Sequence, residues 1–154
     1  MIFMDKPGKN RRVLIAEDNE DDYVLTRDAF IETGLPVELL WVKDGEELMD
    51  FLKNDAPDLI LLDLNMPKKN GKEALKEIKS DRRLRRIPVV AFSTSGSESD
   101  VQSTFDLGIN SYIQKPVGFD QYVRVLRALY DYWFDVSKIS SGLPAGRQAS
   151  ADAA

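Results

Sequence analysis

The stretch Leu59-Ile60-Leu61-Leu62-Asp63 is the most informative part of this chain. Four consecutive aliphatic residues are typical of a strand that is buried on both faces, as in a parallel sheet. A single carboxylate follows the run, and the next residues, Leu64-Asn65-Met66-Pro67 and then Gly71, have the composition of a loop. The stretch therefore predicts an α/β fold in which Asp63 lies at the carboxyl end of a buried strand.

Three other short apolar runs also end in polar residues. Val13-Leu14-Ile15-Ala16 is followed by Glu17 and Asp18, Val89-Val90-Ala91-Phe92 by Ser93 and Thr94, and Tyr112-Ile113 by Gln114 and then Lys115-Pro116. Open parallel sheets bind their ligands at the carboxyl ends of the strands. We therefore expect three acids, a hydroxyl and a lysine to meet at one edge, which suits one divalent cation and one phosphoryl group.

The remaining pattern alternates between strand and helix. We expect strands at 13–16, 37–42, 59–62, 89–92 and 112–113, and helices at 20–33, from Gly45 to before Asp55, at 71–80, at 98–107 and from about Phe119 onward. Five strands that alternate with five helices imply right-handed crossovers and helices on both faces of a parallel sheet. We expect one domain over residues 11–136, with flexible ends at 1–10 and 137–154 that are too short for an output domain.

Composition excludes several kinds of chemistry. The 154 residues are 43% hydrophobic and 31% charged, which is normal for one globular domain. The chain has no cysteine and no histidine, so it lacks a thiolate nucleophile and the usual zinc ligands. Any metal must be held by oxygen, which favours Mg²⁺ or a similar hard cation.

Charge and hydropathy exclude two kinds of partner. The net charge of −5 argues against nucleic-acid binding, and we expect the arginines of the run 81–86 to form a solvated face. No apolar run approaches the length of a membrane span, and the apolar start of residues 1–7 is too short for a signal peptide. We therefore expect a cytoplasmic protein with no membrane partner.

Together these strand ends resemble the receiver domain of two-component response regulators, the CheY-like family. The matching residues are Glu17-Asp18, Asp63 with Asn65, Met66-Pro67 and Gly71, Ser93-Thr94, and Tyr112 with Lys115-Pro116. The likeness covers roughly residues 11–133 and implies a doubly wound (βα)5, flavodoxin-like sheet of order 2-1-3-4-5. The segment 63–71 and the aromatic run 131–134 also resemble the single-domain regulators that are paired with bacteriophytochrome-type histidine kinases.

The resemblance implies a role for each acid. Asp63 would accept a phosphoryl group from a histidine kinase. Asp18 and Asp63 would bind Mg²⁺ or Mn²⁺ directly, Glu17 through water, and Asn65 through its backbone carbonyl. Lys115 would pair with the phosphoryl oxygens and hold Asp63 in place. A divalent cation is needed because a carboxylate is a poor nucleophile toward a negatively charged phosphoryl group.

Three further residues would form the switch. Ser93 would donate a hydrogen bond to the phosphoryl group, Thr94 is small enough to leave that group room, and Tyr112 would respond on the side of the fourth helix and fifth strand. Glu17 stands where the family more often has Asp, and Ser93 where it more often has Thr.

Each residue also has an ordinary structural interpretation. Taken singly, Asp18 suits a helix cap, Asp63 a cap or turn, and Lys115 a surface site. The joint pattern favours the site, because independent caps have no reason to carry complementary charges at one edge. Two other functions are weighed: a haloacid-dehalogenase type phosphatase, which needs an acid at the position of Asn65, and a flavodoxin-like nucleotide module, which needs a glycine-rich loop after the first strand. A receiver-like scaffold that is never phosphorylated is a further alternative.

The last helix carries more apolar surface than one buried stripe requires. Val123, Leu126, Tyr130 and Trp133 lie at helical spacing, and further apolar residues lie on neighbouring faces: Tyr122, Leu129, Tyr132, Phe134 and Val136. The alternatives are a helix with a wide core contact and a partner surface. We expect a homodimer through the face of the fourth helix, fifth strand and fifth helix, with Tyr130, Trp133 and Phe134 at the seam.

Overall fold

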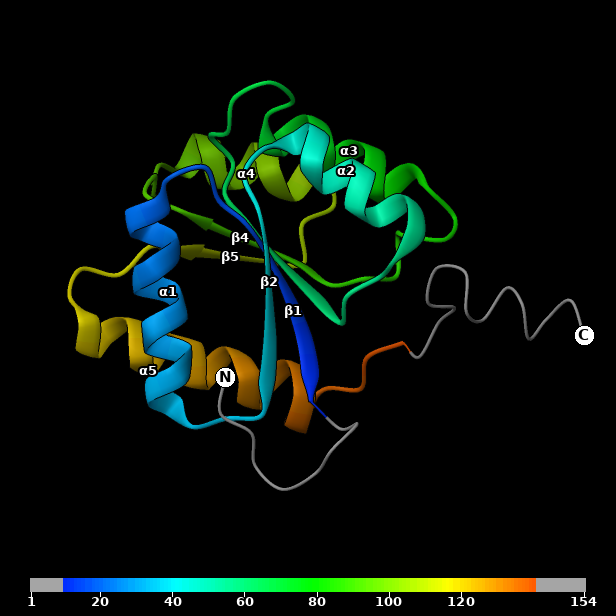
Figure 1. The fold of residues 1–154 in the computed structure, drawn as a ribbon. Helices are drawn as coiled ribbons and strands as arrows, with labels where there is room; N and C mark the ends of the chain where they lie inside the picture. The colour runs from blue at the N-terminus through cyan, green and yellow to red at the C-terminus, as the bar shows by residue number, and fades with distance from the viewer. Residues whose placement is uncertain (1–9, 141–154) are drawn as a thin grey trace, which may run out of the picture.

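The computed structural model of the chain describes residues 10–140. Residues 1–9 and 141–154, which make up most of the two ends expected to be flexible, lie outside the described residues. The described part forms five strands and five helices in alternation, followed by a short π-helical segment (Figure 1). The elements are β1 Arg11–Ala16, α1 Glu20–Thr33, β2 Val37–Val42, α2 Gly45–Asn54, β3 Leu59–Leu62, α3 Gly71–Ser80, β4 Val89–Ser93, α4 Glu98–Asp106, β5 Ser111–Gln114, α5 Phe119–Tyr130 and η1 Asp131–Val136.

The strands form one parallel sheet of order β2-β1-β3-β4-β5, which confirms the predicted fold class and strand order. The central strands β1, β3 and β4 are almost wholly buried, whereas β2 and β5 lie at the edges and are partly exposed. This burial explains why β3 is a continuous aliphatic run, since a central parallel strand is covered on both faces.

Two hydrophobic cores lie on opposite faces of the sheet. One face packs against α1 and α5, and the other against α2 and α3, with α4 in the same layer (Figure 1). Alternate residues of each central strand supply the two cores, since successive side chains of a strand point to opposite faces. In β3, for example, Leu59 and Leu61 belong to the first core, and Ile60 and Leu62 to the second.

The carboxyl end of α5 differs from the expectation. The helix ends at Tyr130 and continues as the π-helical η1, which carries the expected seam residues Trp133 and Phe134. The buried residues of α5 are Tyr122, Leu126 and Leu129. Of the predicted stripe, Leu126 is buried, and Val123, Tyr130 and Trp133 are half-buried and pack against the core under α1 and α5. The predicted stripe thus faces the core, although the π-helical turn of η1 replaces the α-helical period after Tyr130.

The seam residues contribute to the protein's own fold. Tyr130, Trp133 and Phe134 are half-buried and pack against the core under α1 and α5. The Phe134 ring lies edge-on to Tyr130, with ring centroids 5.1 Å apart, and the Arg11 guanidinium lies 5.2 Å from the Phe134 centroid. More exposed apolar side chains of η1 are Tyr132 and Val136, at 52% and 72%. Within residues 10–140, no helix is long and apolar enough to cross a membrane.

Candidate functional site

Backbone hydrogen bonds beyond the strand ends place the key residues side by side. The Asp63 amide donates to the Ala16 carbonyl, and the Glu17 amide donates to the Val42 carbonyl, both at 3.0 Å. The Lys115 amide donates to the Ser93 carbonyl at 2.7 Å. Each strand pair is thereby extended by one residue, so the polar residues that follow the strands meet at the carboxyl edge of the sheet.

A close backbone approach fixes the end of β3. The Gly71 amide donates to the Leu64 carbonyl at 3.1 Å, which draws the start of α3 against the Asp63 loop. A Cβ atom on Gly71 would lie 2.4 Å from the Asp63 carbonyl oxygen and 2.6 Å from Leu64 Cα. Only glycine fits at this distance, so Gly71 belongs to the support of the site.

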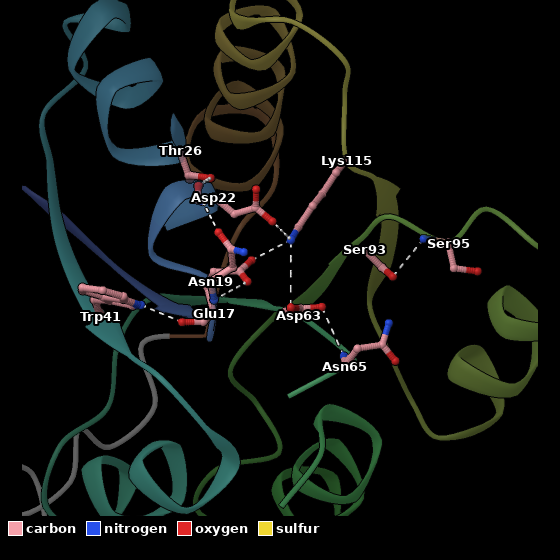
Figure 2. Close-up of polar contacts among 10 residues, drawn as sticks. All are labelled: Glu17, Asn19, Asp22, Thr26, Trp41, Asp63, Asn65, Ser93, Ser95 and Lys115. Carbon is pink, nitrogen blue, oxygen red and sulfur yellow. Dashed lines mark hydrogen bonds and ion pairs between the residues drawn. The ribbon is translucent and has the colours of Figure 1, made fainter. Parts of the chain in front are cut away.

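Three carboxylates converge at this edge, as the sequence predicts. One oxygen from each of Glu17, Asp18 and Asp63 lies within 4.8 Å of the others. Glu17 and Asp63 are 4% and 7% exposed, whereas Asp18 is exposed. The Asn65 amide donates to Asp63 Oδ1 at 3.1 Å, which orients the Asp63 carboxylate (Figure 2).

Lys115 reaches the acids from the loop after β5, but its closest partners differ from the expectation. Its Nζ atom donates to Glu17 Oε1 at 2.7 Å and to Asp22 Oδ2 at 2.9 Å, and it lies 3.9 Å from Asp63 Oδ2 (Figure 2). The ammonium is thus held mainly by the α1 side of the site and faces Asp63 at a longer distance. The sequence predicted the cluster correctly but not the order of these contacts.

Burial and crowding of like charges raise the pKa of two of the acids. Burial raises the pKa of Glu17 to about 7, and the Asp63 charge adds to this rise, although the hydrogen bond from Lys115 opposes it. Burial likewise raises the pKa of Asp63, against the attraction of Lys115. Burial lowers the pKa of Lys115, but hydrogen bonds to Glu17 and Asp22 outweigh it, so that pKa is raised overall. The lysine is therefore charged, and its single charge only partly offsets the acids.

Asp22 is the site residue that sequence reasoning missed. It lies in the first turn of α1, where Asn19 caps the helix by accepting a 2.9 Å hydrogen bond from the Asp22 amide. An acid in a first helical turn is ordinary, because it interacts favourably with the helix dipole. The available signal was its place in the first turn of α1, directly after the loop that carries Glu17 and Asp18.

Trp41 supports the same loop from the edge strand β2. Its Nε1 donates to the Glu17 carbonyl at 2.8 Å. Its ring stacks on Tyr23 of α1, with centroids 4.0 Å apart and planes at 4°. These contacts tie the β1–α1 loop, which carries Glu17 and Asp18, to β2.

The predicted switch residues lie after β4 and on β5. Ser93 is fully buried at the end of β4, and its Oγ accepts from the Ser95 amide at 3.2 Å. Thr94 is exposed, whereas Tyr112 is half-buried on β5 and its hydroxyl donates to the Ser95 carbonyl at 2.8 Å. Hydrogen bonds therefore connect Ser93, Ser95 and Tyr112 into one group. The Lys115 backbone joins this group through its bond to the Ser93 carbonyl.

Comparison of the sequence with known protein families identifies the family to which this site belongs. Residues 13–127 match the family described as the response regulator receiver domain. The chain belongs to this family. The shared fold and the family assignment confirm the resemblance and set aside the phosphatase and nucleotide-module alternatives, since receiver domains are signalling domains.

Several solved or curated receiver domains are similar over most of their length. Response regulator Rcp1 of Synechocystis sp. is 33% identical over 138 residues, which cover 85% of this chain and 94% of Rcp1. Its Mn²⁺-bound crystal structure gives a TM-score of 0.76 over 85% of this chain and 99% of that one.

Two phytochrome-linked regulators extend this similarity. The phosphorylated cyanobacterial phytochrome response regulator RcpA is 39% identical with a TM-score of 0.79, over 86% of this chain and 99% of that one. The bacteriophytochrome response regulator AtBRR is 35% identical with a TM-score of 0.66, over 79% of this chain and 93% of that one. This receiver domain is thus similar, over most of its length, to two regulators whose names connect them to phytochromes.

The donor set of the acidic edge fits a hard divalent cation. Three carboxylates supply the oxygen ligands that Mg²⁺ and Mn²⁺ prefer. Burial is the main cause of the raised pKa of Glu17 and of Asp63, and the charge of a neighbouring acid adds to it, so like charges are crowded at this edge. A bound cation would relieve that crowding.

Proposed function

We propose that this receiver domain accepts one phosphoryl group on Asp63 from the phosphohistidine of a sensor kinase. The observation that supports this most directly is the placement of Asp63, a buried carboxylate with two further acids within 4.8 Å and an ammonium 3.9 Å away. This arrangement combines a nucleophile, cation ligands and a positive charge at one edge of the sheet. The protein would catalyse only its own phosphorylation and dephosphorylation.

The proposed step is a transfer between two acceptors. An Asp63 carboxylate oxygen forms a bond to phosphorus as the bond from phosphorus to the histidine nitrogen of the kinase, or to the leaving oxygen of a small donor, breaks. The Asn65 amide holds Asp63 Oδ1, which leaves Oδ2 facing Lys115 as the attacking oxygen. Lys115 then pairs with the oxygens of the transferred group.

We propose that Glu17, Asp18 and Asp63 hold Mg²⁺ or Mn²⁺, together with the backbone carbonyl of Asn65. When bound, the cation screens the repulsion between the carboxylate and the phosphoryl oxygens. The Mn²⁺-bound structure of Rcp1 supports this proposal by similarity. The Ser93 hydroxyl would donate a hydrogen bond to the transferred group. Its contact with Ser95 would pass the change to Tyr112 and to the face formed by α4, β5 and α5.

The partner that we propose is a sensor histidine kinase of bacteriophytochrome type. Its support is the similarity to RcpA and AtBRR, whose names link them to phytochromes. We also propose that the chain forms a homodimer through α5, η1 and the neighbouring α4–β5 face. The exposed side chains of Tyr132 and Val136 support this, because apolar side chains that gather on a surface mark interfaces.

Incubation with Mg²⁺ and acetyl phosphate tests the proposed acceptor. The wild-type chain should gain the mass of one phosphoryl group in intact-mass spectrometry, and a chelator should prevent the gain. Asp63→Asn should abolish it, whereas Asp120→Asn, which changes an exposed acid on α5, should leave it intact. Equal labelling of the wild type and Asp63→Asn would overturn the assignment, and no labelling of either would favour a receiver-like scaffold that is never phosphorylated.

A further inference from the structure

Asp22 is the one acid of the cluster that binds Lys115 without lying among the three carboxylates that can hold a cation. Its Oδ2 accepts from Lys115 Nζ at 2.9 Å, and the lysine side chain is only 6% exposed. Glu17, the other short partner of Lys115, is also a member of the cation-binding set. Lys115 is therefore held by two carboxylates, of which only Glu17 is also placed to bind a cation.

Asp22 is well fixed for an anchoring role. Its amide donates to the Asn19 side chain at 2.9 Å, and its carbonyl accepts from Thr26 Oγ1 at 3.0 Å, so its backbone is held at both sides (Figure 2). It projects from the first turn of α1 across to a lysine that is 93 residues away in the sequence. A charge-assisted hydrogen bond between two buried or half-buried partners is stronger than one between neutral groups.

The three N–H donors of the Lys115 ammonium can be compared with the acceptors that surround it. An ammonium group has three N–H donors. Glu17 and Asp22 take one each, and the third partner within 4 Å is Asp63 Oδ2, at 3.9 Å. That distance is too long for a hydrogen bond, so Asp63 Oδ2 is a nearby acceptor that Lys115 does not bind.

We infer that Asp22 is a positioning residue that holds the Lys115 ammonium on the α1 side of the site, with one donor left for a phosphoryl group on Asp63. The inference rests on the proposed function for the role of that donor. If Glu17 binds a cation, Asp22 is the carboxylate that still holds the Lys115 ammonium. Without Asp22, the nearest unused acceptor is the Asp63 oxygen, and Lys115 would close on the nucleophile itself.

The direct test measures the Lys115 ammonium by NMR at low temperature, in the metal-free full chain. A buried ammonium held by two carboxylates exchanges its hydrogens slowly enough to give a separate nitrogen-correlated signal, and Lys115→Ala identifies that signal by removing it. In Asp22→Asn, loss of one charge-assisted hydrogen bond should accelerate hydrogen exchange about tenfold or more. Asp22→Glu, which keeps a carboxylate, should restore part of the protection.

The matched control is Asp21→Asn, which removes the same charge from the exposed neighbouring position in the same helical turn. It should leave the signal and its exchange rate unchanged, which separates a specific contact from a general change in charge. Amide spectra of all variants report whether the fold is intact. An unchanged exchange rate in a folded Asp22→Asn variant, or no protected Lys115 signal in the wild type, would overturn the inference.

A second measurement separates this inference from the proposed function. With Mg²⁺ and acetyl phosphate, Asp22→Asn should be labelled about tenfold more slowly than Asp21→Asn, because Lys115 then competes for the Asp63 oxygen. If the wild type is not labelled at all, the proposed function fails, while the exchange measurement still decides whether Asp22 holds Lys115. If the wild type is labelled and the two variants behave alike in both measurements, Asp22 has no positioning role.

Discussion

At the scale of single residues, the acidic edge is governed by an imbalance of charge. Lys115 makes short contacts with Glu17 and Asp22 and a longer one with Asp63. Asp18 lies close to Glu17 and Asp63 and adds a further negative charge. One cation therefore faces four acids. Buried charges without partners are costly, so this edge is poised to take up further positive charge.

Replacement of Lys115 tests that balance. Lys115→Ala should retain Mg²⁺ binding, with an affinity unchanged or raised by up to about tenfold, because a unit positive charge beside the acids is removed. The response to a phosphoryl group should nonetheless be lost, since its partner is missing. The measurements are a Mg²⁺ titration and the amide spectrum with and without beryllofluoride. Lys53→Ala, on the exposed face of α2, is the control; a full beryllofluoride shift in Lys115→Ala would show that another residue couples the site to the fold.

The raised pKa of Glu17 predicts how stability depends on pH. Folding raises this pKa from its ordinary value of 4.5 to about 7. The folded state therefore binds the proton more tightly, so the metal-free protein gains stability below pH 7 and loses it as the pH rises through about 7. Because the chain has no histidine, no side chain of ordinary pKa titrates in this window.

Thermal unfolding in the presence of a chelator should therefore give a higher Tm at pH 6 than at pH 8. Glu17→Gln, which has no titrating group at this position, should reduce the difference. Saturating Mg²⁺ should stabilise the wild type more at pH 8 than at pH 6, because the cation competes with the proton. A Tm that rises from pH 6 to pH 8 in the chelated wild type would contradict the assigned shift.

Most of the site residues could be predicted because they follow strands directly. Glu17, Asp63 and Lys115 are each one residue past a strand end, so topology alone brings them together. Asp22 and Trp41 could not be found in this way. The role of Asp22 depends on how α1 is rotated about its axis, and that of Trp41 on its side chain reaching the Glu17 carbonyl. Strand order predicts neither.

At the scale of elements, caps and glycines determined how well boundaries could be predicted. The start of α1 after Asn19 and its end before Gly34 agree with the structure, because the cap hydrogen bond and the left-handed glycine are local features. The change from α-helix to the π-helical η1 after Tyr130 was not predicted, because it has no such local signal. Trp133 and Phe134 pack in part against the core, and the more exposed apolar residues of η1 are Tyr132 and Val136.

The contact between α3 and the end of β3 gives a prediction at this scale. Gly71→Ala should destabilise the fold by about 1–3 kcal/mol, because the new Cβ overlaps the Asp63 carbonyl and must push α3 away. It should also weaken Mg²⁺ binding, since Asp63 moves with the loop. Urea denaturation and a Mg²⁺ titration measure the two effects, with Lys76→Ala on the exposed side of α3 as the control. Wild-type stability and affinity would mean that the loop yields without moving Asp63.

At the scale of the whole molecule, the site and the η1 part of the expected dimer surface lie at opposite ends of the strands. The acids lie at the carboxyl edge of the strands, whereas η1 packs near Arg11, where β1 begins (Figure 1). Trp133 and Phe134 contribute part of their surface to the core under α1 and α5. Replacing them would disturb the monomer as well as any seam, so the exposed residues of the same segment are better probes.

The last prediction is a homodimer that these exposed residues help to hold. Large apolar side chains at the centre of a seam contribute about 2 kcal/mol or more each, so Tyr132→Glu/Val136→Glu should dissociate a dimer of micromolar affinity. Phe105→Glu, at an exposed site on α4, tests whether the α4–β5 face belongs to the same seam, and Lys53→Glu on α2 is the control for an added acid. Light scattering after size-exclusion chromatography at equal concentrations gives the masses, with and without beryllofluoride. A monomeric wild type under both conditions would remove the dimer and leave this surface for a different protein partner.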